Sequence, residues 1–145
     1  MNDFLTLRKQ LCFSLYEVSS EFTRLYTNTL KEFGLTYPQY LVLLSLWEKD
    51  HVTMKELGEH LNLGTGTLTP MISRMEANGW LKKERSNMDE RKVFISLNQK
   101  AKEQQSLISS RIEVMIGHCQ IDIAEYQMLM NQLAHLKKKL VKHTS

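Results

Sequence analysis

A cysteine near the start of the chain shares one helix face with hydroxyl-bearing side chains. At about 100° per residue, the residues that fall on this face are Cys12, Tyr16, Ser19 and Tyr26. A thiol attacks a peroxide only as the thiolate, and a free cysteine has a pKa of about 8.5, so this chemistry needs neighbours that stabilise the anion. A phenol that donates a hydrogen bond to sulfur does so. The face could carry thiol redox chemistry, although a lone helical cysteine is more often a small packing residue.

The second cysteine, Cys119, lies far along the chain. The two thiols form neither a disulfide framework nor the Cys-x-x-Cys spacing of a structural zinc site. A disulfide needs Cα atoms within about 7 Å, which the sequence does not determine. Cys119 can therefore be either a resolving thiol or a buried or free cysteine. Metal-ligating residue types occur without a zinc spacing at His118, Cys119, Asp122 and His135. We expect no metal and no other cofactor.

The two ends of the chain carry the pattern of long amphipathic helices. Residues 4–33 repeat apolar side chains at spacings of three and four until Gly34, and residues 98–143 continue in two helices that begin near Asn98 and Ile121. Neither apolar face has an obvious mate within the chain. We therefore expect both end segments to pack against a second copy in a two-fold symmetric homodimer.

Shorter helices are predicted in the middle of the chain. A buried helix begins near Pro38, capped by Thr36 or the residue after it. A second helix covers 53–61, where Thr53 and Glu56 form a capping box. A third helix follows a Gly-containing turn, begins at residue 65 or 67, and ends at the Asn-Gly of 78–79.

The third helix has two different faces. Its inward face is apolar and consists of Leu68, Met71, Ile72 and Met75. Its outward face carries short hydroxyls and one long cation, at Thr65, Thr67, Thr69, Ser73 and Arg74. Such side chains can contact base edges and phosphates in a major groove of DNA.

A basic hairpin follows this helix. Residues 80–85 and 92–97 are predicted as strands around a polar loop, 86–91. Between residues 82 and 92, five cations stand against three carboxylates, so the hairpin is locally positive. An arginine at its tip could enter a minor groove, while a purely solvated hairpin is the alternative. The order of the elements predicts a mainly α winged helix-turn-helix with a small β-hairpin, which points to DNA.

The overall composition limits the class of protein. We expect one domain, 1–145, with dimerisation helices at about 4–33 and 98–143 around a DNA-binding region at about 38–97. The net charge of +3 is modest for a DNA-binding protein, so binding must depend on local placement of cations. The longest apolar run, 41–47, is far too short to cross a membrane, and no apolar leader follows the start. These features predict a cytoplasmic protein without membrane contact.

Five segments resemble the MarR family of transcriptional regulators, and within it the organic hydroperoxide resistance regulators and their staphylococcal relatives. The segments are QLCFSLY at 10–16, LTYPQYL at 35–41, GTLTPM at 66–71, RME at 74–76 and DER at 89–91. The resemblance extends over nearly the whole chain. It implies a dimeric repressor that binds an inverted-repeat operator in double-stranded DNA. In that branch, an organic hydroperoxide oxidises an N-terminal cysteine and the repressor releases its operator.

The resemblance also implies roles for single residues. Cys12 matches the sensing thiol, and two phenols, Tyr26 and Tyr37, match hydrogen-bond donors to it from the same or the partner subunit. Cys119 lies where some members carry a resolving thiol; a low-molecular-weight thiol is the other implied partner. The implied DNA contacts are Thr65, Thr67, Arg74 and the wing-tip Arg91, with Asp89 orienting Arg91. One departure is Gly64, where relatives often carry aspartate, so operator preference is expected to differ.

Two other functions compete with this hypothesis. A MarR-type repressor could respond to a phenolic or lipophilic ligand instead, and Cys12 would then be incidental. A thiol peroxidase would use Cys12 catalytically. The chain lacks a Thr-x-x-Cys before it, a Ser/His/Asp order and a phosphate loop, so we expect no enzyme.

Overall fold

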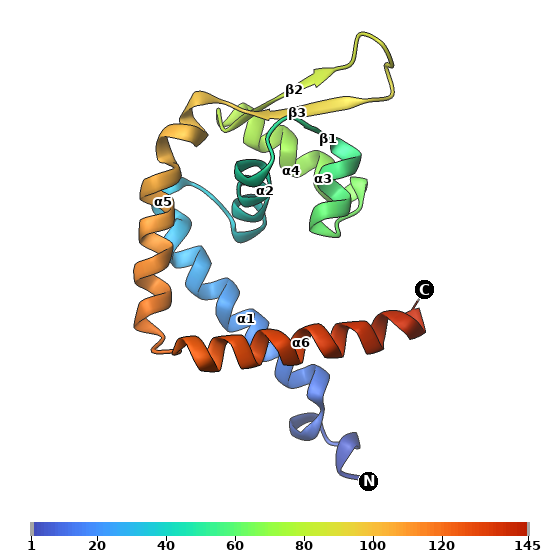
Figure 1. Ribbon diagram of the computed structural model, residues 1–145, viewed down its shortest axis with the longest axis vertical. Helices are drawn as coiled ribbons and strands as arrows, with labels where there is room; N and C mark the ends of the chain where they lie inside the picture. Colours follow the sequence, from blue (N-terminus) through green and yellow to red (C-terminus); the bar gives the residue numbers. More distant parts are fainter. Residues whose placement is uncertain (1, 145) are drawn as a thin grey trace. The chain divides into compact units, whose positions relative to one another are not determined.

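The computed structural model describes residues 2–144, with side chains from residue 4 onward. The residues group into two compact units, Met1–Arg111 and Ile112–Ser145. Most of the chain is helical and one small antiparallel sheet is present, which confirms the predicted fold class (Figure 1). That the whole chain forms a single domain stays a prediction. No helix among residues 2–144 is long and apolar enough to cross a membrane.

The N-terminal segment is not one continuous helix. Its elements are the 3₁₀ turns Asn2–Leu5 and Leu7–Lys9, helix α1 (Leu11–Leu30) and a closing 3₁₀ turn, Lys31–Phe33. The predicted helix from residue 4 is therefore wrong at its start: Gln10 is extended, with ψ of 124°, and interrupts the helical hydrogen bonds although the apolar spacing continues. The end is as predicted, because Gly34 has a φ of 68°, which suits glycine.

Three helices form the middle of the first unit: α2 (Tyr37–Glu48), α3 (Met54–Leu61) and α4 (Thr65–Ala77). Thr36 and Gln39 form a capping box before α2. Thr53 accepts a hydrogen bond from the Glu56 amide at 3.1 Å, so the predicted cap of α3 is present on the threonine side. Helix α4 begins at Thr65, one of the two predicted starts, and accommodates Pro70 in its interior.

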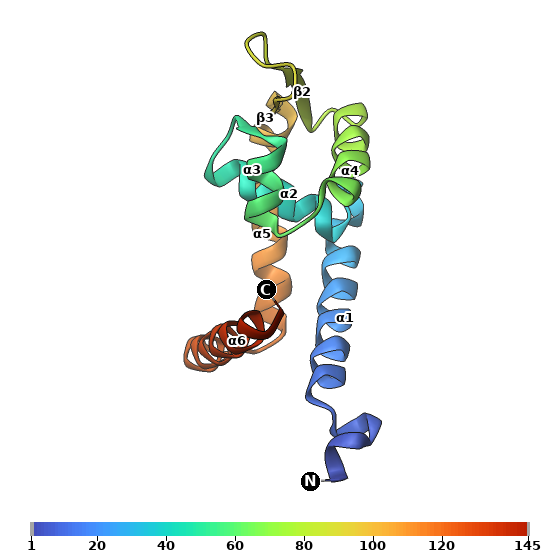
Figure 2. The same ribbon diagram turned by 90° about the vertical axis from the view of Figure 1, so that its right-hand side faces the viewer.

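The sheet has three strands rather than the two predicted. They are β1 (Val52–Thr53), β2 (Leu81–Arg85) and β3 (Val93–Leu97), in the order β1-β3-β2. Both pairings are antiparallel, with Leu81 opposite Leu97 and Val52 opposite Ile95. The prediction missed β1 because two residues are too few to show an alternating pattern. The hairpin of β2 and β3 projects beyond α3 and α4 (Figure 2).

A shared core holds the helices against the sheet. The side chains with almost no exposure are Leu43, Leu46, Leu57, Leu68, Ile72, Met75, Trp80, Leu81 and Ile95. Apart from Trp80, which directly precedes β2, they come from α2, α3, α4, β2 and β3, so α4 and the hairpin share this core. The start of α5 (Gln99–His118) joins it, because Ala101 is buried and its carbonyl accepts a hydrogen bond from Trp47 Nε1 at 3.2 Å. Asn98 precedes α5, where a cap was predicted. Its side-chain Nδ2 donates to the carbonyls of Gly79 and Leu81 instead.

The second unit consists of the end of α5 and helix α6 (Ile123–Thr144). Asp122 caps α6 by accepting a hydrogen bond from the Glu125 amide at 2.8 Å. None of the described residues of α6 is buried. The exposed apolar side chains of this helix include Leu129, Leu133, Leu140 and Val141. A helix with so many exposed apolar side chains fits the prediction of a dimerisation helix at this end of the chain.

Candidate nucleic-acid interface and thiol site

Helix α4 presents a polar outward face. Leu68, Met71, Ile72 and Met75 are buried as predicted, and the side chains left exposed on the other side include Thr65, Thr67, Thr69 and Arg74. The Arg74 side chain makes no hydrogen bond or ion pair within residues 2–144. A long cation without an internal partner, beside three threonines, is suited to base edges and phosphates.

A tight turn between α3 and α4 sets the angle between the two helices. The Leu63 amide donates to the Gly58 carbonyl at 2.9 Å, and Asn62 has a left-handed φ of 56°. A Cβ atom at Gly58 would lie 2.8 Å from the Leu63 carbonyl oxygen and 3.6 Å from Leu68 Cδ2. Only glycine therefore lets the turn close this tightly. This role of Gly58 was not predicted from the sequence, although a glycine inside a predicted helix was a signal for it.

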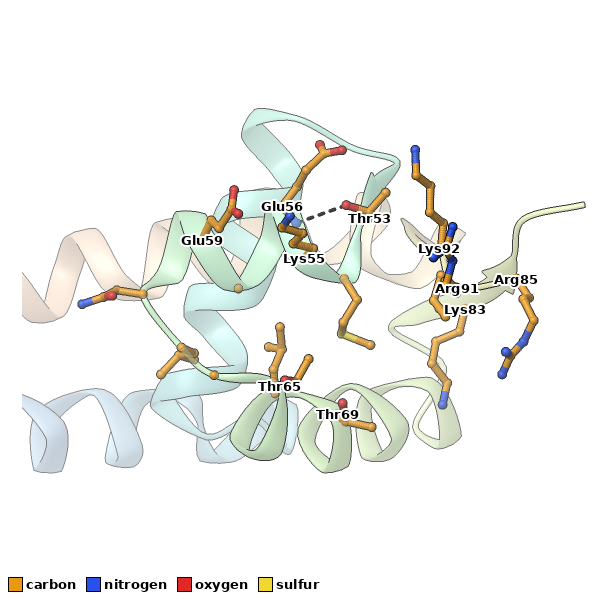
Figure 3. Close-up of a pocket in the computed structure, with 17 residues that line it drawn as sticks. Thr53, Lys55, Glu56, Glu59, Thr65, Thr69, Lys83, Arg85, Arg91 and Lys92 are labelled. Carbon is orange, nitrogen blue, oxygen red and sulfur yellow. Dashed lines mark hydrogen bonds between the residues drawn. The ribbon is translucent and has the colours of Figure 1, made fainter. Parts of the chain in front are cut away.

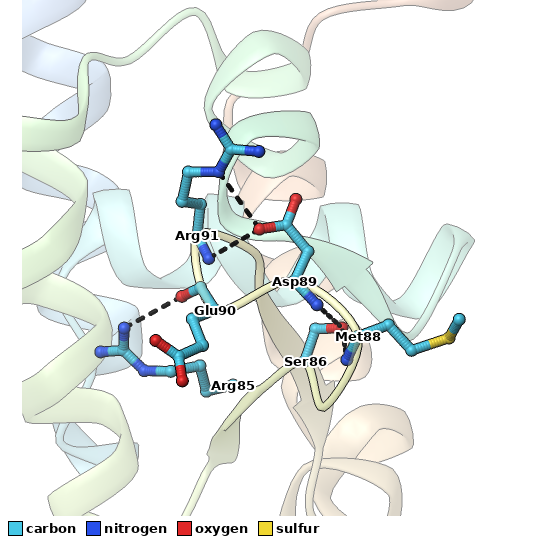
Figure 4. Close-up of polar contacts among 6 residues, drawn as sticks. All are labelled: Arg85, Ser86, Met88, Asp89, Glu90 and Arg91. Carbon is cyan, nitrogen blue, oxygen red and sulfur yellow. Dashed lines mark hydrogen bonds and ion pairs between the residues drawn. The ribbon is translucent and has the colours of Figure 1, made fainter.

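The loop between β2 and β3 is closed by hydrogen bonds at its base and tip (Figure 4). Ser86 Oγ accepts from the amides of Met88 and Asp89, both at 3.2 Å. Asp89 Oδ1 accepts from the Arg91 amide at 3.0 Å and from Arg91 Nε at 3.2 Å. The Arg91 side chain is 92% exposed, against 34% for Asp89. Asp89 thus orients a guanidinium that projects into solvent, the geometry expected of a groove-reading arginine.

The base of the hairpin is fastened by two residues that the sequence analysis did not assign. Asp50 Oδ1 accepts hydrogen bonds from the amides of His51 and Leu97, at 2.8 and 2.9 Å. The His51 ring stacks on Phe94, with centroids 4.7 Å apart, and its Nδ1 pairs with Ser96 Oγ at 2.8 Å. These contacts join the end of α2 to β3. They hold the wing on the helical core.

A groove of about 1230 Å³ runs between α3, the start of α4 and the hairpin (Figure 3). The cations that line it are Lys55, Lys83, Arg85, Arg91 and Lys92, and the carboxylates are Glu56 and Glu59. Figure 3 shows the hairpin cations together at one end, while the two glutamates lie on α3. This end is positive and open, which favours a phosphodiester backbone.

The thiol of Cys12 is exposed in the first turn of α1. Its Sγ donates to Gln10 Oε1 at 3.2 Å. Tyr16, one turn later, stacks loosely on Phe13 with centroids 6.4 Å apart. An oxidant in solution can therefore reach the sulfur atom in a single chain.

Tyr26, predicted on the same helix face as Cys12, lies far from that cysteine along α1. Tyr26 is fourteen residues after Cys12 on α1, which at 1.5 Å per residue places it about 21 Å away along the axis. Cys12 and Tyr26 share an angle around the helix, as predicted from their spacing, but their separation along the axis prevents contact within one chain. Tyr26 instead meets Tyr37, with ring centroids 4.7 Å apart, and Tyr40, at 5.7 Å.

Tyr40 is the buried member of this tyrosine cluster. Burial, and secondarily the nearby Tyr37 phenol, raise the pKa of Tyr40 above the usual value for tyrosine. Tyr26 and Tyr37 remain partly exposed beside it. Two partly exposed phenols packed on a buried aromatic base can donate hydrogen bonds to an anion on another surface.

Cys119 is half-buried just after α5, and its Sγ lies 3.6 Å from the Met115 carbonyl. It belongs to the second unit, whereas Cys12 belongs to the first. Within residues 2–144, no group of three or more His, Cys, Asp or Glu side chains is arranged to hold a metal ion.

The arrangement of these elements matches that of known regulators. The family model for the transcriptional regulator SarA/Rot matches residues 24–108, which include α2, α3, α4 and the hairpin. The chain is a SarA/Rot-type transcriptional regulator of the MarR family.

This regulator is similar in sequence to named transcriptional regulators of two bacteria. It is 50% identical over 97 residues to the organic hydroperoxide resistance transcriptional regulator of Bacillus subtilis, covering 67% of this chain and 66% of that one. It is 37% identical to the HTH-type transcriptional regulator MgrA of Staphylococcus aureus, covering 93% of this chain and 95% of MgrA.

Solved structures match nearly the whole chain. Reduced AbfR bound to DNA, a protein of Staphylococcus epidermidis, is 40% identical and matches with a TM-score of 0.83 over 93% of this regulator and 94% of AbfR. AbfR is also known in an overoxidised form bound to DNA and in a disulfide-formed state. These relatives establish this regulator as a DNA-binding winged helix with redox-sensing relatives.

Proposed function

We propose that this regulator is a dimeric repressor that releases its operator when an organic hydroperoxide oxidises Cys12. The observation that carries the proposal is the exposed Cys12 thiol at the start of α1, in a chain half identical over 97 residues to an organic hydroperoxide resistance regulator. Exposed apolar side chains precede the thiol in the sequence, at Phe4, Leu7 and Leu11, and would suit an organic peroxide better than a hydrophilic one. A cytoplasmic location is part of the proposal.

A second copy would complete the thiol site. Apolar side chains of α1 are exposed along its length, at Leu11, Val18, Phe22 and Leu25. If two α1 helices pack antiparallel about a two-fold axis, the Cys12 end of one meets the Tyr26 end of the other. The Tyr26 and Tyr37 phenols of the second copy would then donate to the thiolate and stabilise it. The distance of about 21 Å within one chain supports this division between two copies.

The same two-fold axis would present two DNA-reading surfaces. Each α4 would enter a major groove with Thr65, Thr67 and Arg74, and each Arg91 would reach the adjacent minor groove. Two such helices about one helical turn apart predict an inverted-repeat operator with half-sites about 10 base pairs apart. The locally positive end of the groove supports this placement.

Oxidation would proceed in two steps. The thiolate sulfur attacks the terminal peroxide oxygen, the O–O bond breaks, and the sulfur becomes a sulfenic acid while the departing alkoxide takes a proton from solvent and leaves as the alcohol. A thiol then displaces water from it and forms a disulfide, with either a low-molecular-weight thiol or Cys119. We infer that the disulfide is the releasing species, because overoxidised AbfR is known bound to DNA and a disulfide-formed AbfR is known as well. The bulk of the new group would repack the helices and displace both α4 helices from operator spacing.

The test uses the full-length protein and a duplex from its own promoter region. Cumene hydroperoxide with a small thiol is expected to release the wild type, and dithiothreitol to restore binding. Cys12→Ser should bind as the wild type does and stay bound under oxidant. Cys119→Ser should still be released when the small thiol is present, and loss of its release would make Cys119 the resolving thiol. Release of Cys12→Ser equal to the wild type would support ligand control instead. Loss of binding in reduced Cys12→Ser would show that Cys12 is structural.

The number of hydroperoxide molecules consumed per chain distinguishes a sensor from a peroxidase. Without reductant, we expect each chain to consume about one hydroperoxide at Cys12, because the sulfur is not regenerated. Residual peroxide is measured with a dye after the reaction stops. Continued consumption of many equivalents with a thiol present, at an enzymatic rate, would favour the peroxidase.

A further inference from the structure

Lys83 on strand β2 joins the hairpin to the recognition helix. Its Nζ donates to Ser73 Oγ at 2.9 Å, and its backbone amide donates to Glu76 Oε2 at 2.8 Å. Nζ also lies 3.9 Å from Glu76 Oε1. Both acceptors are on α4, one turn apart. Ser73, expected on the DNA-facing side of that helix, is thus held by the hairpin.

The position of β2 in the sheet explains why this amide needs a side-chain partner. The strand order β1-β3-β2 leaves β2 at an edge, where alternate N–H groups have no neighbouring strand. Glu76 supplies the missing acceptor for the Lys83 amide. The side chains of Lys83 and Glu76 are 29% and 39% exposed, so water weakens their ion pair only in part. Three contacts therefore join one residue of β2, Lys83, to two residues of α4, Ser73 and Glu76.

The neighbouring Lys82 has the same charge but a different environment. It lies on the opposite face of the strand and pairs with Glu84 at 3.0 Å, with its side chain 53% exposed. Within residues 2–144, no hydrogen bond or ion pair joins the Lys82 side chain to α4. The two lysines are adjacent and carry the same charge, but they differ in exposure and in the residues they contact.

We propose that Lys83 is a positioning residue for DNA recognition, which holds α4 at a set distance and rotation from the wing through Ser73 and Glu76. The proposal rests on the operator recognition proposed above. Arg74 follows Ser73 on α4, and Arg91 stands on the wing. An operator that is contacted by both arginines can bind tightly only if Arg74 and Arg91 are correctly spaced. Non-specific DNA responds only to their charges. Lys83 acts on this spacing and does not serve as a phosphate contact, although it lines the groove.

The test compares Lys83→Met with Lys82→Met in the reduced full-length protein. Affinity is measured for a duplex from the regulator's own promoter and for a scrambled duplex of the same composition, over a series of salt concentrations. Lys83→Met should lose about tenfold in affinity for the promoter duplex and little for the scrambled one, with an unchanged slope against log salt. Lys82→Met should change the ratio of the two affinities little.

Three outcomes would overturn the proposal. A salt slope reduced by about 1 per subunit, with equal losses on both duplexes, would make Lys83 a phosphate contact. Equal behaviour of the two variants would remove the positioning role. Additive losses for Lys83→Met and Glu76→Gln in a double-mutant cycle would show that the residues act separately. If the wild type itself does not discriminate the promoter duplex, operator recognition fails before Lys83 is tested.

A folding control keeps the result interpretable. Circular dichroism and thermal unfolding of each variant report whether the α4–β2 contact is needed for the fold. If Lys83→Met unfolds, Ser73→Ala replaces it, because this change removes only the hydroxyl that accepts from Nζ. Ser73→Ala should reduce the affinity ratio in the same direction, and an unchanged ratio in a folded Ser73→Ala protein would overturn the proposal.

Discussion

Arg91→Ala is expected to weaken binding of the dimer to its promoter duplex by about 30-fold or more, from two lost groove contacts of about 1 kcal/mol or more each. The side chain is 92% exposed and its Asp89 ion pair is weak in water, so thermal stability should hardly change. Fluorescence anisotropy with labelled duplex measures the affinity, and differential scanning calorimetry measures the stability. The effect should therefore appear in binding alone.

Two further variants test how Arg91 works. Arg91→Lys keeps the charge but loses the planar guanidinium, and should recover only part of the affinity. Asp89→Ala removes the carboxylate that holds Arg91 at Nε and at its amide, and should cost less than losing Arg91 itself. Unchanged affinity of Arg91→Ala would remove the wing tip from the proposed interface.

Gly58→Ala is expected to destabilise the fold, although alanine is ordinarily the better helix former. Alanine should gain about 1 kcal/mol within a helix. Its Cβ, however, would lie 2.8 Å from the Leu63 carbonyl oxygen, a backbone atom that cannot move alone. Overpacking of this kind costs about 1–3 kcal/mol, so the net change should be a loss. Because the α3–α4 turn must open, promoter affinity should fall as well.

Gly66→Ala is the matched control. Gly66 is also helical, but a Cβ atom there would meet nothing within 4 Å, so alanine at this position should be neutral or stabilising. Urea unfolding of the two variants gives free energies of opposite sign if the Gly58 contact decides the outcome. Stabilisation by both substitutions would show that the turn is looser than its geometry indicates.

The sequence predicted those features that depend on local spacing. The caps at Thr36 and Thr53, the inward face of α4 and the end at Gly79 follow from short-range patterns, and the structure contains them. Asp89 and Arg91 are two residues apart, so their contact was also within reach of a motif.

Features that depend on distant residues were out of reach. Strand β1 exists only because β3 pairs with it, and Asp50 bonds the Leu97 amide 47 positions away. The Lys83 contacts to α4 require the α4–β2 turn to place a strand edge beside a helix. The angular grouping of Cys12 with Tyr26 was misleading for a different reason: helical phase reports a direction around the axis and contains no information on separation along it.

The separation of Cys12 and Tyr26 on α1 has a genetic consequence. If each sulfur is activated by the other copy's phenols, a chain lacking the thiol and a chain lacking the phenols carry complementary defects. Co-expressed, they would form mixed dimers in which one site is complete and the other lacks both parts. Two alleles that each fail to respond to oxidant alone would then restore a partial response when they are expressed together. A sensor contained within one chain could not show such complementation.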